Sequence, residues 1–286
     1  MQNLSNISTV KDILTRYGFT FSKSLGQNFI VNPSVCPKIA EMGFAKKGAG
    51  IIEIGSGIGV LTSELASRAD KVVCIEIDSR LLPILNETLE EFDNIKIIND
   101  DVLNVNLEEL IKSEFQGLDV SICANLPYYI TSPILMSLLK AKLPIKAITV
   151  MVQKEAAVRI CAKPGSRDFG ALSVAVQYYS EPEILFNVSK GSFIPSPEVD
   201  SSVIRLNILS SPRVNPNDED FFFEVIKAAF LQRRKTLVNS LSTYFCTDKN
   251  KLIQLLEINS INSKIRPEQL TLQQFEKIAN ILKDFR

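Results

Sequence analysis

The chain has 286 residues, of which 45% are hydrophobic and 22% charged, and its formal net charge at pH 7 is zero. The composition is that of a globular protein, and the length fits an α/β domain with a smaller second domain, since domains usually hold about 100 to 200 residues. A zero net charge gives no overall attraction for a polyanion, so any contact with nucleic acid must come from local clusters. Histidine is absent, which excludes Ser-His and Cys-His nucleophile pairs and imidazole metal ligands.

The sequence predicts a cytoplasmic protein without a membrane partner. It has no apolar run long enough to cross a bilayer, and its start, "MQNLSNISTVKDIL", lacks the apolar core of a secretory signal. The cysteines are scattered without C-x-x-C spacing, which favours reduced thiols over disulfides or a zinc site. These cysteines are Cys36, Cys74, Cys123, Cys161 and Cys246.

Short apolar runs alternate with stretches of helical spacing from about residue 49 onward. The runs cover residues 50–54, 71–77, 95–98, 118–124 and 146–152. Strands separated by helices predict parallel βαβ units and a doubly wound sheet. Two later runs, 183–188 and 202–208, predict a pair of strands that closes one edge. We therefore expect an α/β fold with a mostly parallel, seven-stranded sheet.

The C-terminal part has a different pattern. The stretch "SSPRVNPND" at 210–218 is rich in residues that favour turns and predicts a linker. The remainder has a helical period and no strand pattern. We predict a first domain at 1–208, with a helical or loop extension at about 1–30, and a small all-helical domain at 209–286.

A glycine-rich loop follows the first predicted strand, in "IIEIGSGIGVLTSEL". Glycines let the backbone turn tightly and approach a ligand closely. The spacing is G-x-G-x-G, starting at Gly55, and not the G-x-G-x-x-G of dinucleotide sites. Glu53 lies two residues before Gly55 and would repel a pyrophosphate. This loop favours a cationic, amino-bearing ligand.

Acidic residues end the next two predicted strands. Glu76 lies 21 residues after Gly55, the distance at which nucleoside-binding folds place a carboxylate against ribose hydroxyls. Asp78 is an alternative, although its position also suits turn capping. Asp101 follows the third strand and could accept a hydrogen bond from an adenine amine. Acids at strand ends often only cap turns, but their joint occurrence with the glycine loop predicts S-adenosylmethionine as the cofactor.

The stretch "NLPYYITSPI" follows the fourth predicted strand, beside the same cleft. Pro127 has no N–H group to donate, so the turn exposes carbonyls, and Asn125 adds a side-chain acceptor. Acceptors that hold both N–H groups of adenine N6 would free its lone pair for attack on a sulfonium methyl, without prior deprotonation. Tyr128 offers a face for stacking an extruded base. A Pro-Tyr turn with packing aromatics is the alternative, and we would favour it without the glycine loop.

Six motifs together resemble one family, the ribosomal RNA adenine dimethyltransferases, and most closely its small-subunit (16S) branch. They are "SLGQNFI", "EIGSGIG", "CIEID", "NLPYYITSPI", "FIPSPEVDSSVIRL" and "AAFLQRRKTLVNSL". The resemblance runs from about residue 10 to the C-terminus. It implies a Rossmann-like class I methyltransferase that dimethylates N6 of two adjacent adenosines in the 3′-terminal hairpin loop of small-subunit rRNA, during subunit biogenesis. We expect a monomer without a metal, acting on the immature small subunit.

The resemblance also implies roles for individual residues. Cofactor contacts are implied for Asn28, Ile30, Gly55 at the methionine end, Glu76 at the ribose, Asp101 at the adenine, and Asn125. The catalytic loop would comprise Asn125, Leu126, Pro127 and Tyr128, with Phe193 as the second face that holds the target adenine. For Phe193, a core position at a strand end is a strong alternative.

A cluster of basic residues in the C-terminal part predicts RNA contact. The cluster consists of Lys227, Arg233, Arg234 and Lys235. Such clusters are usually solvated helix faces, but the match of "QRRKT" to the family favours phosphate binding. Three basic residues near the N-terminus could add to it, namely Lys11, Arg16 and Lys23.

Three alternatives compete with this interpretation. The large-subunit rRNA methyltransferases that confer macrolide resistance share "GQNF" and an N-[LI]-P-[YF] motif but lack "AAFLQRRKTLVNSL". A non-enzymatic ribosome assembly or transcription factor of this fold would not need the set of Glu76, Asp101, Asn125 and Tyr128. An NAD-dependent dehydrogenase disagrees with the G-x-G-x-G spacing. The chain departs from the usual family pattern "NLPYNISTP" at Tyr129 and in the order of Thr131 and Ser132.

Overall fold

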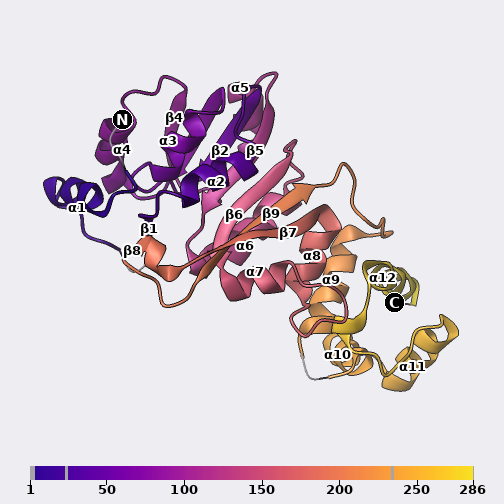
Figure 1. Ribbon diagram of the computed structural model, residues 1–286. Helices are drawn as coiled ribbons and strands as arrows, with labels where there is room; N and C mark the ends of the chain where they lie inside the picture. The colour runs from indigo at the N-terminus through magenta and orange to yellow at the C-terminus, as the bar shows by residue number, and fades with distance from the viewer. Residues whose placement is uncertain (1–3, 23–24, 233–234, 286) are drawn as a thin grey trace. The chain divides into compact units, whose positions relative to one another are not determined.

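The computed structural model describes residues 4–22, 25–232 and 235–285. A seven-stranded sheet is its central element (Figure 1). The strands are β2 (Ala49–Ile54), β3 (Lys71–Glu76), β4 (Ile95–Asn99), β5 (Asp119–Asn125), β6 (Ala147–Gln153), β7 (Ser180–Val188) and β9 (Ser201–Ile208). Their order is β4-β3-β2-β5-β6-β9-β7. Strands β2 to β6 pair in parallel, and β9 runs antiparallel to β6. The predicted α/β fold with a mostly parallel sheet is confirmed.

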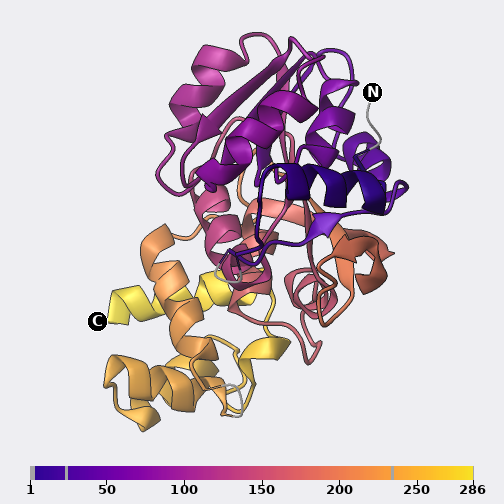
Figure 2. The same ribbon diagram turned by 90° about the vertical axis from the view of Figure 1, so that its left-hand side faces the viewer.

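Helices lie on both faces of this sheet (Figure 2). They are α1 (Ile7–Arg16), α2 (Val35–Met42), α3 (Val60–Ala66), α4 (Leu82–Thr88), α5 (Leu107–Glu114), α6 (Thr131–Lys140) and α7 (Lys154–Ile160). All six residues of β2 are buried, which is the pattern of a parallel strand covered on both faces. One cluster of buried side chains joins α1, α2, α3 and α4 to the sheet, and its members Ile13, Ile39 and Leu65 are fully buried. This core packs against the part of the sheet from which the glycine loop emerges.

A second, two-stranded sheet was not predicted from the sequence. It pairs β1 (Phe29–Ile30) with β8 (Phe193–Ile194) in antiparallel register, with Phe29 opposite Ile194 and Ile30 opposite Phe193. Three short 3-10 helices lie in the same part of the chain: η1 (Ser79–Leu81), η2 (Tyr128–Ile130) and η3 (Lys190–Ser192). Because β1 is paired with β8, the "GQN" motif directly before β1 is held close to β8.

The C-terminal part is helical, as expected. It contains α9 (Glu219–Phe230), α10 (Leu237–Phe245), α11 (Lys249–Ile258), η4 (Pro267–Gln269) and α12 (Leu272–Phe285). Helix α9 contacts α8 (Ala171–Tyr179), α10 and α12. Asp218 caps α9, because its Oδ1 accepts a hydrogen bond from the Phe221 amide over 2.9 Å. Within the described residues, no helix has both the length and the apolar character needed to cross a membrane.

The chain clusters into two compact units. The first comprises residues up to Ala157 together with Glu183–Ile208, and the second comprises Val158–Pro182 together with Leu209–Arg286. The domain division that the sequence predicts lies after residue 208 and keeps residues 158–182 in the first domain. Their clustering with α9 has a physical cause: the Tyr179 ring stacks on Phe223 with centroids 5.8 Å apart, and the Tyr179 hydroxyl donates to Glu219 over 2.6 Å.

Candidate active site

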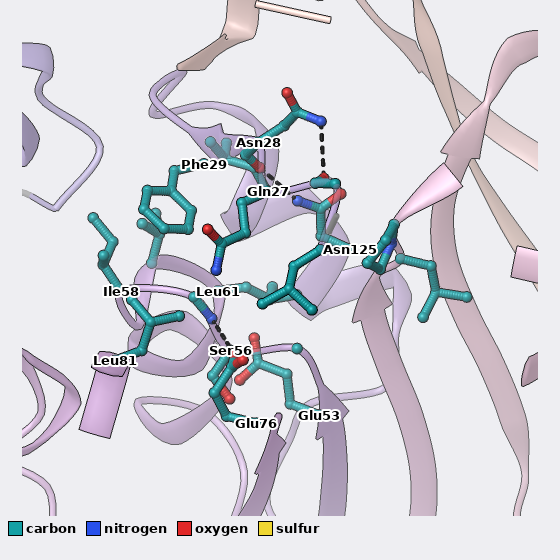
Figure 3. A pocket seen from close by; sticks show the side chains of 18 of the residues that line it. Gln27, Asn28, Phe29, Glu53, Ser56, Ile58, Leu61, Glu76, Leu81 and Asn125 are labelled. Atoms are coloured by element: carbon teal, nitrogen blue, oxygen red, sulfur yellow. Dashed lines mark hydrogen bonds between the residues drawn. The ribbon is translucent and has the colours of Figure 1, made fainter. Parts of the chain in front are cut away.

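A pocket lies at the carboxyl ends of β2, β3 and β5 (Figure 3). The strand order reverses between β2 and β5, and open α/β sheets bind ligands at such a reversal. Seven of the ten residues predicted for the catalytic and cofactor sites line this pocket, and three do not. The lining ones are Asn28, Ile30, Gly55, Glu76, Asn125, Leu126 and Pro127.

The glycine loop forms one wall of the pocket. Gly55 and Gly57 have φ of +76° and +59°, in the left-handed region that only glycine adopts readily. A Cβ atom built on Gly57 would lie 3.2 Å from Cε1 of Phe29. The backbone conformation and the close approach of β1 therefore both favour glycine at position 57.

Glu53 is a buried acid beside this loop. Its Oε2 accepts a hydrogen bond from the Thr62 hydroxyl over 2.5 Å and contacts the Cys74 thiol at 3.6 Å. Burial, with a smaller contribution from the nearby Glu76 carboxylate, raises the pKa of Glu53 to about 8, although the hydrogen bonds from Thr62 and Cys74 lower it. A cationic group bound next to Glu53 would compensate this cost, which agrees with the cationic ligand predicted from the sequence.

Glu76 presents a second carboxylate to the pocket, close to Glu53 in Figure 3. Its Oε2 accepts the Gly57 amide over 3.0 Å, and its Oε1 accepts the Asp78 amide over 2.9 Å. Burial raises the pKa of Glu76, whereas the two backbone amides favour its ionised form. A carboxylate held by two backbone groups has a fixed orientation, as a group that binds ribose hydroxyls requires.

Asp78, the alternative ribose ligand, has a different task in the structure. Its carboxylate caps η1 by accepting the Arg80 amide over 3.1 Å, and it forms an ion pair with the Arg80 guanidinium over 2.7 Å. This pairing lowers the pKa of Asp78. Asp78 is not among the lining residues of the pocket.

Asn125 ends β5 and faces the pocket from the opposite side (Figure 3). Its Nδ2 donates to the backbone carbonyl of Asn28 over 3.1 Å, while the Asn28 side chain donates to the carbonyl of Gly26 over 3.1 Å. The donating end of the Asn125 amide is thereby fixed by the "GQN" segment. Its Oδ1 atom is oriented as an acceptor.

Three predicted site residues lie outside the pocket lining. Tyr128 is half-buried, with its hydroxyl 2.8 Å from Ser201 Oγ. Phe193 is only 3% exposed and belongs to the apolar core of the first unit. The Asp101 carboxylate accepts the Leu103 amide over 3.0 Å. The pocket therefore brings together the residues of "NLP" and the predicted cofactor residues other than Asp101. It does not include Tyr128 or Phe193.

Apolar residues that sequence reasoning missed complete the pocket walls. Ile77, Ile58 and Leu61 line it, and Ile77 is 52% exposed although it directly follows a buried strand. The signal for Ile77 is an apolar residue between the two acids of "EID" at a strand end, where alternation places it outside the core. The sequence did not indicate Ile58 and Leu61 as pocket residues, because apolar residues in the glycine loop and in α3 are also expected in the core.

The pocket fits S-adenosylmethionine chemically. The buried Ser56 Oγ has no hydrogen-bond partner among the described residues, and buried polar atoms normally have one. Glu53 and Glu76 suit an ammonium group and ribose hydroxyls, and Ile77 offers an apolar face to a planar base. Among the described residues, no group of three or more His, Cys, Asp or Glu side chains is arranged to hold a metal ion.

A second pocket lies wholly within the second unit and is rich in basic residues. Its lining includes Arg167, Lys264 and Arg266, all exposed. The Leu237 amide donates to the carbonyl of Ile265 over 2.9 Å, which joins the start of α10 to the stretch between Lys264 and Arg266. The sequence did not indicate this group because Arg167 is far in the chain from Lys264 and Arg266.

The predicted RNA-binding residues can be placed only in part. Lys227 and Lys235 are exposed, whereas Arg233, Arg234 and Lys23 lie outside the described residues. Arg16 is already engaged, since its guanidinium bonds both oxygens of Glu87, over 2.6 and 3.1 Å. These bonds raise the pKa of Arg16 and tie α1 to α4.

Comparison with known proteins identifies the family. The model of the ribosomal RNA adenine dimethylase family matches residues 18–284. A protein of Bacillus cytotoxicus named ribosomal RNA small subunit methyltransferase A is 49% identical over 286 residues, which covers 99% of this chain and 98% of that protein. Its namesake from Alkaliphilus oremlandii is 47% identical over 283 residues, covering 99% of both chains.

Solved structures agree with this assignment. A dimethyladenosine transferase from Plasmodium falciparum is 25% identical, with a TM-score of 0.71 over 90% of this chain and 97% of that one. The 23S rRNA methyltransferase ErmE is also 25% identical, with a TM-score of 0.66 over 89% of this chain and 99% of that one. The predicted class I methyltransferase fold is confirmed. This chain belongs to the ribosomal RNA adenine dimethylase family.

Proposed function

We propose that this protein is an S-adenosylmethionine-dependent enzyme that dimethylates N6 of two adjacent adenosines in the 3′-terminal hairpin loop of small-subunit rRNA. The observation that carries the chemistry is the Asn125 amide, whose nitrogen is fixed by the Asn28 carbonyl over 3.1 Å. Its oxygen is thereby oriented to accept a hydrogen bond from an adenine amine. The near-complete alignment with relatives named for the small subunit supports the choice of substrate.

Asn125 and the backbone that follows it would hold the two N–H groups of the target amine. The Pro127 carbonyl already accepts the Ile130 amide and the Thr131 hydroxyl, each over 3.2 Å. Its two lone pairs are therefore in use, and the Leu126 carbonyl is the better second acceptor. Two acceptors on one nitrogen oppose delocalisation of its lone pair into the ring and make it a nucleophile.

Bound S-adenosylmethionine would supply an electrophilic methyl group on a sulfonium. Glu53 would face the ammonium group of its amino-acid end, Glu76 would hold the ribose hydroxyls, and Ile77 would pack against the adenine. No residue has to remove a proton before the attack, because the amine becomes acidic only once it is alkylated. This agrees with a sequence that lacks histidine.

The target adenine needs a stacking partner outside the cofactor pocket. Tyr128 is the better candidate, because it is only half-buried and lies directly after Pro127. Phe193 would have to leave a core in which it is 3% exposed. We therefore assign the first stacking face to Tyr128, and we assign Phe193 a contact only if β8 moves when RNA binds.

Basic residues of the second unit would contact the rRNA backbone. Lys227 and Lys235 are exposed, and so are Arg167, Lys264 and Arg266 around the basic pocket. Lys and Arg residues that neutralise phosphates give affinity without reading the base sequence. We assign the second unit to rRNA recognition, and we propose a cytoplasmic monomer that acts on an immature small subunit.

The large-subunit enzymes are the second candidate, since ErmE shares the fold with a TM-score of 0.66. The test measures transfer of isotope-labelled methyl groups to each ribosomal subunit. The subunits are prepared from cells that lack both the small-subunit and the large-subunit adenine methylation. We expect label in small-subunit rRNA only. Label in large-subunit rRNA alone would mean that the substrate is large-subunit rRNA. Cofactor binding without transfer to the rRNA of either subunit would favour a non-enzymatic assembly factor.

A further inference from the structure

The side chain of Asp78 has more partners than the capping of a turn requires. Its side chain is 5% exposed. Oδ1 accepts the Arg80 amide over 3.1 Å and Arg80 Nε over 2.8 Å. Oδ2 accepts Arg80 Nη2 over 2.7 Å and, from a distant part of the chain, Gln27 Nε2 over 2.7 Å. The carboxylate therefore joins the end of β3 to the "GQN" segment.

The partners of Asp78 continue this connection into the N-terminal part of the chain. The Gln27 Oε1 atom accepts the Ser22 amide over 2.9 Å. Arg80 Nη1 donates to the carbonyl of Thr20 over 3.2 Å, and the Arg80 guanidinium lies 4.9 Å from the centre of the Phe19 ring. Gln27, Asp78 and Arg80 thus hold both ends of the segment, at residues 19–22 and at residue 27. We call these three residues the clasp.

The clasp touches both functional ends of the pocket. On the cofactor side, the Asp78 amide donates to Glu76 Oε1 over 2.9 Å. On the target side, Gln27 precedes Asn28, whose carbonyl accepts Asn125 Nδ2 over 3.1 Å. In Figure 3, Gln27 and Asn28 lie over the pocket from the same segment. Glu76 is therefore connected to Asn125 by hydrogen bonds through Asp78 and Gln27 and by the backbone between Gln27 and Asn28.

Attachment of the segment to the protein does not depend on the clasp. The rings of Phe19, Phe21 and Phe29 form an apolar cluster with centroids 5.3 to 6.0 Å apart, and Phe29 packs against the glycine loop. Apolar contacts supply most of the stabilisation but little directional control, whereas charge-assisted hydrogen bonds fix orientation. The clasp therefore sets the position of Gln27 and of the Asn28 carbonyl next to it.

We propose that Gln27, Asp78 and Arg80 act as positioning residues, which hold the "GQN" segment over the cofactor and orient Asn125 toward the target amine. Cofactor retention and orientation of the acceptor are then controlled by the same hydrogen bonds. Neither Gln27 nor Asp78 transfers a group or a proton. The part that concerns Asn125 rests on the proposed function, and the part that concerns cofactor retention does not.

The test uses Gln27→Met in the full chain. Methionine keeps the length and apolar contacts of glutamine but cannot bond Asp78 or accept the Ser22 amide. We expect S-adenosylmethionine to dissociate about tenfold faster, measured by stopped-flow mixing, with a matching loss of affinity in calorimetry. Hydrogen exchange of the amides at 19–22 and 25–30 should also become faster. The kcat at saturating cofactor should fall, because Asn125 loses its fixed orientation.

The matched control is Asn94→Leu. Asn94 also joins two segments through a side-chain amide, with bonds of 2.9 and 3.0 Å to the carbonyls of Ala66 and Ala69, but it does not line the pocket. It should lower the melting temperature without changing cofactor dissociation. A Gln27→Met variant that behaves in the same way would overturn the clasp. If wild-type protein retains cofactor but methylates no rRNA, the proposed function fails while the cofactor part of the inference stands.

Discussion

At the scale of single residues, the pocket combines two buried acids with one oriented amide. Glu53 and Glu76 both have pKa values raised by burial, so the protein carries an electrostatic cost at the place where a cation would bind. Asn125 lies across the pocket from these acids, and its side-chain nitrogen donates a hydrogen bond to the Asn28 carbonyl. In the proposed mechanism, the acids would hold the cofactor and the amide would hold the nucleophile.

The Asn125→Ala variant should separate these two tasks. Loss of one positioned oxyanion-hole donor typically lowers kcat by about 10² to 10³, and we expect a loss of this size for the positioned acceptor of Asn125. Affinity for S-adenosylmethionine in calorimetry should change far less, because Glu53 and Glu76 remain. An Asn106→Ala variant, which removes only the cap of α5, serves as the control. Near-normal methylation by Asn125→Ala would refute the role of the amide.

The pKa of Glu53 also predicts how stability depends on pH. Its folded value of about 8 lies above its ordinary value, so the folded protein binds a proton that the unfolded chain releases between about pH 4.5 and 8. The contribution of Glu53 to stability is therefore fully present below pH 4.5 and is lost as the pH rises through 8. The slope can reach about 1.4 kcal/mol per pH unit.

Glu53→Gln should remove this slope. Urea unfolding of the cofactor-free protein between pH 5 and 8 should show a flatter dependence on pH than the wild type, and the variant should be the more stable form at pH 8. Glu64→Gln changes a partly exposed glutamate and controls for the altered charge. Equal slopes for Glu53→Gln and the wild type would mean that Glu53 is ionised in the folded protein at neutral pH.

At the scale of secondary-structure elements, the glycine loop and β1 depend on each other. Gly57→Ala should destabilise the protein, because residue 57 has φ of +59° and a Cβ would meet the Phe29 ring at 3.2 Å. Gly117→Ala is the matched control, since Gly117 has φ of +75° and open space around it. Backbone strain alone costs about 1 kcal/mol.

Unfolding by urea and calorimetry with S-adenosylmethionine would distinguish the effect of backbone strain from that of the contact with Phe29. We expect Gly57→Ala to lower the free energy of unfolding by more than Gly117→Ala does, and to weaken cofactor affinity by at least tenfold. Gly117→Ala should leave affinity unchanged. Equal effects of the two substitutions on both quantities would show that the contact with Phe29 is unimportant.

The sequence predicted the elements that local patterns encode. Apolar runs such as residues 50–54 and 118–124 became strands of the main sheet because parallel strands are buried on both faces. The pairing of β1 with β8 could not be predicted, since each strand has two residues and the partners Ile30 and Phe193 are far apart in the chain. The same pairing buries Phe193, which its motif alone could not show.

Side-chain orientation set a similar limit within the candidate site. The spacing of Glu76 and Asn125 after their strands was enough to place both at one pocket. It could not distinguish Glu76 from Asp78, because both follow the same strand. The choice depends on Arg80 and Gln27, which hold the Asp78 side chain away from the pocket.

At the scale of the whole molecule, RNA affinity should depend on basic side chains of the second unit, although the net charge is zero. Lys264→Ala and Arg266→Ala should each weaken binding to small-subunit rRNA. Each should also reduce the slope of log affinity against log salt by about 1, if it contacts one phosphate. Lys249→Ala, an exposed lysine outside the basic pocket, is the control. Unchanged salt slopes would exclude this pocket from the RNA interface.

The most direct test of the account is to identify the product on the RNA. Purified protein, S-adenosylmethionine and small-subunit particles that lack the modification would be incubated, and the 3′-terminal rRNA fragment would be sequenced by mass spectrometry. We predict N6,N6-dimethyladenosine at two adjacent positions of the hairpin loop, and none with Asn125→Ala. Tight cofactor binding with unmodified adenosines at both positions would contradict it.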